Sequence, residues 1–139
     1  MANMTELFLR VHLRDDTPAG LLDWLEKIAA GNDLEAYDAH PFFACRRWHL
    51  ALTGVDEIST PIVGPPLAFG RGSVDGYELR SMLTVHSAFR HYDGEVAAFL
   101  DWITQFVDAD PGDFLGYSLY EDGYDGEPEM PTLIHMPRR

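Results

Sequence analysis

Two segments in which apolar residues recur every three or four positions alternate along this chain with segments in which every second residue is apolar. The first spacing is that of a helix with one buried face, and the second is that of a strand with one buried face. Residues 6–14 predict such a strand, with an apolar face formed by Leu7, Leu9, Val11 and Leu13. Elements with one apolar face must cover one another, so the pattern indicates a layered α+β fold.

The two predicted helices both have recognisable ends. In the first, Asp16 or Thr17 is suited to cap the N-terminus and Pro18 to lie in the first turn. Gly31 is placed to end this helix in a left-handed conformation. The second helix is predicted at residues 93–108, with Asp93 as its cap. The apolar stripes are Leu21, Leu22, Trp24, Leu25, Ile28 and Ala29 in the first helix, and Val96, Phe99, Leu100, Ile103, Phe106 and Val107 in the second.

The remaining segments are read from their turn residues and aromatic content. Residues 77–87, 114–121 and 131–136 predict strands, and the turn-rich segment between the last two indicates a hairpin. Residues 42–52 are short and aromatic, which favours a strand and leaves a helical turn as the alternative. Residues 53–76 contain many Gly and Pro residues and predict a long irregular loop.

Together these elements predict a two-layer sandwich. Two helices on one face of a mostly antiparallel sheet of four to five strands would bury both apolar stripes. The βαββαβ rhythm, with an added C-terminal strand, is similar in topology to the ferredoxin-like arrangement, a likeness that carries no function. Residues 1–139 are expected to form a single globular domain, since this length suits one core.

The net charge of −13 is unevenly distributed. Eleven of the 23 acidic residues lie between Arg90 and Arg138, a stretch without Lys or Arg. Nucleic acids and anionic membrane surfaces need the opposite sign, so neither is an expected partner. A basic protein partner would be attracted, whereas the alternative is that the charge only keeps the chain soluble and monomeric.

The sequence lacks several patterns that would indicate secretion, a membrane span, a disulfide, a metal or a cofactor. The N-terminus lacks the pattern of a secretory signal, and no apolar run approaches the about 18 residues of a membrane span. Cys45 is the single cysteine and cannot form an internal disulfide, so a cytoplasmic location is expected. No metal-ligand spacing, dinucleotide loop or phosphate loop is present, and we expect no metal or cofactor. Either a monomer or a homodimer is expected, since the last strand could leave a sheet edge open.

One candidate contact for a partner is the basic and aromatic group formed by Arg46, Arg47, Trp48 and His49. Arg and Trp dominate binding hot spots because each offers a large contact area with directional polar atoms. The alternative is that these arginines pair with acidic residues on neighbouring elements.

A second candidate contact is the acidic segment 121–129. Its residues Asp122, Asp125 and Glu127 could face a basic partner. Oxygen-rich loops also bind calcium, but the carboxylate spacing is not that of an EF-hand. A solvated hairpin tip is the structural alternative, since Asp and Gly favour turns.

His86, His91 and Asp93 are the candidates for a pocket. They lie at the end of a predicted strand and the start of a predicted helix, and they could converge on a metal or act as an acid–base group. The alternative is that His91 and Asp93 belong only to a turn and a helix cap.

Two functions follow from these features. The first is a non-catalytic protein-binding module of the inhibitor, immunity or regulatory type, which presents an acidic surface or the Arg46–His49 group to a partner. The second is a small enzyme or ligand-binding domain, with a pocket under the 53–76 loop. The absence of a catalytic motif favours the first.

Overall fold

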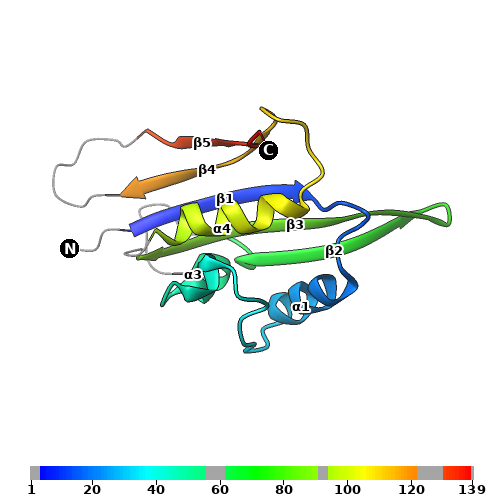
Figure 1. The fold of residues 1–139 in the computed structure, drawn as a ribbon, viewed down its shortest axis with the longest axis horizontal. Helices are drawn as coiled ribbons and strands as arrows, with labels where there is room; N and C mark the ends of the chain where they lie inside the picture. The colour runs from blue at the N-terminus through cyan, green and yellow to red at the C-terminus, as the bar shows by residue number, and fades with distance from the viewer. Residues whose placement is uncertain (1–3, 56–61, 91–93, 122–129, 139) are drawn as a thin grey trace.

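The computed structural model describes residues 4–55, 62–90, 94–121 and 130–138. These residues form one five-stranded antiparallel sheet with four α-helices packed against it, which confirms the predicted α+β class (Figure 1). The strands are β1 (Met4–His12), β2 (Leu67–Val74), β3 (Tyr77–Arg90), β4 (Phe114–Glu121) and β5 (Thr132–His135). The helices are α1 (Ala19–Ala29), α2 (Pro41–Ala44), α3 (Trp48–Thr53) and α4 (Glu95–Ile103), and α4 continues into a 3-10 turn (Thr104–Phe106).

The order of strands across the sheet is β2-β3-β1-β4-β5. The first four strands, with α1 and α4 between them in the chain, follow the predicted βαββαβ rhythm, and β5 is added outside β4 as the hairpin pattern predicted. β1 lies at the centre, and its Phe8 is opposite His86 of β3 and Tyr117 of β4. Residues from the two ends of the chain therefore meet on the middle strands.

The sheet has one buried face and one face without helices in the described part of the chain. Leu7, Leu9 and Val11 of β1 are almost fully buried against the helices, as their alternation predicted. Arg10 and His12, which point to the opposite side, are exposed. We call this opposite side the helix-free face.

Helix α1 buries the predicted stripe, but its N-terminus differs from the prediction. Its N-terminal flanking residue is Pro18, with no side-chain cap. The hydroxyl of Thr17 instead donates to the carbonyl of Arg14 at 2.6 Å, while Asp16 pairs with Arg14. At the other end, Gly31 has a φ of 93°, the left-handed conformation that was predicted there.

Helix α4 starts after Gly94, whose φ of 73° is also left-handed. The predicted cap Asp93 lies outside the described residues. Phe99, Trp102 and Ile103 are fully buried and connect α4 to the core.

The prediction of a strand at residues 42–52 is wrong, because this segment forms α2 and α3. Pro41 occupies the first helical position, and the His40 side chain accepts a hydrogen bond from the Phe42 N–H, which caps α2. Phe42 and Trp102 stack with ring centroids 5.7 Å apart. Aromatic residues that suit a strand by composition are held here in short helices, because their rings fill a core between α1 and α4.

The loop prediction at 53–76 is wrong for its second half, where residues 67–74 form β2. Leu67 and Phe69 pair with Val85 and Leu83 of β3 on the core face. Gly70 is tolerated because β2 is an edge strand, and the register shifts after Arg71. Pairing with a long neighbouring strand therefore outweighs the weak local preference of a glycine-rich segment.

Candidate functional site

Two open cavities lie between α4 and β5, with volumes of about 350 and 450 Å³. Both are lined by Ala97 and Leu100 of α4 and by Ile134 and His135 of β5. Because they share these residues, they form one continuous groove, which we call the α4–β5 groove. A helix forms one wall, and the last strand of the sheet forms the other.

The groove exists because β4 and β5 extend the sheet beyond the helix layer. Figure 1 shows no helix in front of these two strands. A Cβ at Gly116 of β4 would collide with the backbone of Phe8, so only glycine allows β4 to pair this closely with β1. Ile134, opposite Gly116, is 7% exposed and forms part of the floor.

The lining is apolar in the middle and polar toward both ends. Asp101, Thr104 and Arg138 line the smaller cavity, and Ser118 and Thr132 line the larger one. The Thr104 hydroxyl donates to the Leu100 carbonyl at 2.6 Å and is therefore engaged within the helix. Apolar walls with a few polar groups are typical of sites that bind a ligand or a peptide.

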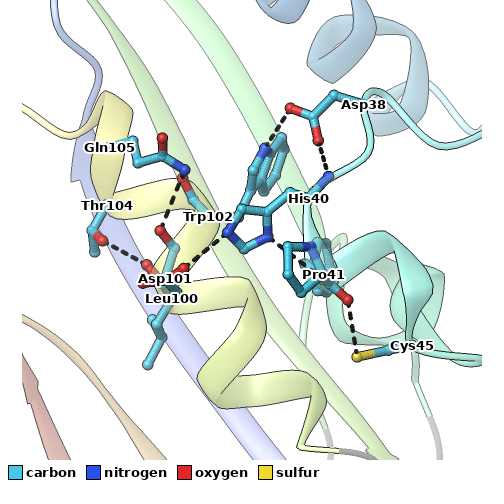
Figure 2. Close-up of polar contacts among 10 residues, drawn as sticks. Asp38, His40, Pro41, Cys45, Leu100, Asp101, Trp102, Thr104 and Gln105 are labelled. Atoms are coloured by element: carbon cyan, nitrogen blue, oxygen red, sulfur yellow. Dashed lines mark hydrogen bonds and ion pairs between the residues drawn. The ribbon is translucent and has the colours of Figure 1, made fainter.

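Asp101 also connects the groove to the segment before α2 (Figure 2). His40 accepts from the Phe42 N–H through Nδ1, so its Nε2 carries the proton and donates to Asp101 at 2.9 Å. Asp38 accepts from the His40 N–H at 2.7 Å and from the Trp102 indole at 3.4 Å. These bonds fix the outer surface of α4 relative to the aromatic core.

Strand β5 is an edge of the sheet in the described residues. The N–H of Met136 donates to Asp113 and its carbonyl accepts from Gly112, so both Met136 groups point toward the β4 side. Backbone direction alternates along a strand, and therefore Leu133 and His135 direct their N–H and carbonyl groups away from β4. This edge offers hydrogen-bonding groups directly beside the groove.

A separate polar cluster lies on the helix-free face and joins three strands. The Glu6 carboxylate is buried and accepts hydrogen bonds from His86 Nε2 at 2.6 Å and from the Tyr117 hydroxyl at 2.9 Å. Phe8 lies against both partners, in edge contact with the His86 ring and stacked on the Tyr117 ring. Burial, followed by the hydrogen bond and the charge of Glu6, raises the pKa of Tyr117 to about 12.

This cluster orients His86 as a carboxylate orients a catalytic histidine. With Nε2 directed to Glu6, Nδ1 is the ring position that remains for another group. Neither cavity of the α4–β5 groove includes His86. Sequence reasoning selected His86 but missed Glu6 and Tyr117, since strand alternation alone does not pair residues 80 and 111 positions apart.

The structure brings only part of the predicted Arg46–His49 group to the surface. Arg46 and His49 are exposed, and Arg47 is half-buried. Trp48 is half-buried and packs against Phe43 and Trp24, with ring centroids 5.0 and 5.9 Å apart. Its indole therefore contributes to the aromatic core, and a role of this group in partner binding stays a prediction.

The other predicted site residues lie outside the described part of the chain. These are His91, Asp93, Asp122, Asp125 and Glu127. The long loop was predicted to cover a pocket. Instead, the parts of the loop that the structure describes at its two ends lie beside β3. Gly54 accepts from the Ala88 N–H and Pro66 from the His86 N–H, and no described loop residue lines the α4–β5 groove.

Comparison with protein-family models, with curated proteins and with solved structures finds no match to this chain. In the described residues, no helix has the length and apolar character needed to span a membrane. No three His, Cys, Asp or Glu side chains in the part of the chain that the structure describes are grouped as a metal site.

Proposed function

We propose that this protein is a non-catalytic protein-binding module, of the inhibitor, immunity or regulatory type, that holds a basic partner at the α4–β5 groove. The groove carries the proposal. Ala97 and Leu100 form an accessible apolar wall, the buried Ile134 forms part of the floor, and the β5 edge of the described sheet adjoins them. Such a surface supports recognition of a polypeptide, which can offer both apolar side chains and backbone hydrogen bonds.

The charge supports a basic partner. The chain carries −13, and Asp101 at the groove rim has a side chain that is 70% exposed. Opposite charge accelerates encounter and disfavours acidic competitors, although it adds less to affinity than the buried contacts do. In this proposal the protein acts in the cytoplasm, and Asp122, Asp125 and Glu127 strengthen the attraction.

The test is capture of partners from a lysate of the source organism at low and high salt, followed by affinity measurements on the purified pair. Neutralising Asp122, Asp125 and Glu127 together should weaken binding more than neutralising Asp15, Glu26 and Asp33, three exposed acidic residues elsewhere. Leu100→Asp should weaken it further, because a charge would enter the apolar wall. A partner whose affinity is insensitive to salt and to Leu100→Asp would contradict the proposal.

A ligand-binding or catalytic role for His86 is the second candidate, and the buried Glu6–His86–Tyr117 cluster favours it. A carboxylate that orients an imidazole is a common arrangement in acid–base sites. The test is an NMR fragment screen that follows the His86 and Tyr117 resonances, with His86→Gln as the control. Fragments that shift these resonances only in the native protein would support this role, and a screen without such fragments would exclude it.

A further inference from the structure

Strand β5 is short, but it carries no charged side chain that would prevent its edge from pairing. Residues 132–135 contain no Lys, Arg, Asp or Glu, and the register shift in this hairpin lies on β4. Natural edge strands are usually protected by charges, bulges or a covering element. Pro131 and Pro137 flank the strand and confine the available edge to the residues between them.

The positions of the open backbone groups match the position of the groove. Alternation from Met136, whose backbone groups bond the segment before β4, directs the N–H and carbonyl groups of Leu133 and His135 outward, at the strand that forms one groove wall. In an added strand, alternate side chains would point toward the same face as Ile134, which is the groove side. Ala97 and Leu100 would contact those side chains from the helix.

We infer that the partner contributes an extended segment that binds as a sixth strand along β5, with alternate apolar side chains in the α4–β5 groove. This inference rests on the proposed function and specifies how the groove would be used. The remaining side chains of the segment are basic, because the chain carries a net charge of −13, whereas the groove itself is lined by one residue of each sign, Asp101 and Arg138. Main-chain hydrogen bonds supply affinity, and the groove supplies selectivity for apolar residues at alternate positions.

A second copy of this chain is the competing occupant of the same edge. Pairing two β5 strands would bring together two chains that each have a net charge of −13. Repulsion between them opposes association at low salt. Sedimentation equilibrium at low and high salt decides between them. A dimer that forms at low salt and is abolished by Leu133→Pro would overturn the inference in favour of homodimerisation.

The decisive experiment uses a defined peptide and two variants of one residue. The probe is a capped six-residue peptide of alternating Lys and Val, with an alternating Glu and Val peptide as the control. Leu133→Pro removes an outward N–H without removing a bond to β4, whereas Leu133→Ala keeps that N–H. Thermal unfolding and an amide NMR spectrum first establish that both variants are folded.

We expect the Lys–Val peptide to bind and to protect the Leu133 and His135 amides from hydrogen exchange. Leu133→Pro should weaken this binding by about tenfold, and Leu133→Ala by less than about threefold. Equal binding of the peptide to Leu133→Pro and to the native protein would overturn strand addition. In that case, salt-sensitive capture of a partner would still support the proposed function, so the two failures are distinguishable.

Discussion

The two edges of the sheet differ in how they are protected. Edge strand β2 carries Arg71, whose guanidinium lies 5.8 Å from the centre of the Phe69 ring, and α1 packs beside this strand. Edge strand β5 carries no charged residue, and no helix lies in front of it in Figure 1. The helix layer leaves β4 and β5 uncovered, so β5 provides both an open edge and one wall of the groove in the described part of the chain.

This difference is the reason that the proposed binding surface lies at β5 and not at β2. An unprotected edge invites aggregation unless it is short, and β5 has four residues between two prolines. A protein that keeps such an edge open on one side while closing the other has a surface suited to strand addition.

The largest difference in unfolding free energy should be between alanine substitutions at two glycines, Gly116 of β4 and Gly70 of β2. Gly116→Ala should lower the free energy of unfolding by about 3 kcal/mol, because the new Cβ would collide with the Phe8 backbone and push β4 and β5 from β1. Gly70→Ala on β2 should change it by less than about 0.5 kcal/mol, since a Cβ at this residue would meet nothing within 4 Å. Urea unfolding measures both, and similar losses would show that β4 is not closely packed.

Substitutions at two neighbouring residues of β5 should have different costs in unfolding free energy, because one side chain faces the core and the other faces solvent. Ile134→Ala should cost about 2 kcal/mol, because Ile134 is 7% exposed at the groove floor. Leu133→Ala should cost less than about 0.5 kcal/mol, because Leu133 is 56% exposed. Equal costs in urea unfolding would mean that both faces of β5 are buried in solution.

The Glu6–His86–Tyr117 cluster should stabilise the pairing of β4 with the central strands, and none of its residues belongs to β5. The pKa of Tyr117 is about 12 against an ordinary value of 10, so the folded state holds this proton more tightly than the unfolded state. The resulting stability is present below pH 10 and is lost as the pH rises through about 12. Tyr117→Phe should remove this decline, as measured by unfolding between pH values of about 9 and about 12.

Glu6→Gln provides the control for the cause. It removes the charge and alters the hydrogen bond, whereas burial, the largest cause, remains. The pKa of Tyr117, followed by tyrosinate absorbance, should therefore fall but stay above 10. No change on this substitution would contradict the contact between Glu6 and Tyr117.

The charge on the protected edge should have the smallest effect. Arg71→Ala should lower the free energy of unfolding by about 0.5 kcal/mol through loss of the contact with Phe69. It should not promote association in sedimentation experiments, because α1 still packs beside β2. Concentration-dependent association of this variant would show that Arg71 itself blocks the β2 edge.

Much of the fold could be predicted from local pattern. The alternation of Leu7, Leu9 and Val11 placed β1, and the stripe from Leu21 to Ile28 placed α1. Turn residues placed the ends of β4 and β5 to within one residue. These elements are recognisable because each repeats its own period over enough residues.

The amino-acid sequence by itself therefore determined the α+β class, the two long helices, four of the five strands and the acidic charge. Packing in three dimensions decided that residues 41–44 and 48–53 are helical, that a glycine-rich segment is β2, and that β5 forms a groove with α4. It also brought together Glu6, His86 and Tyr117. The physical reason is distance along the chain: periodicity records which face of an element is buried, whereas partners far apart in sequence are chosen by packing and strand pairing.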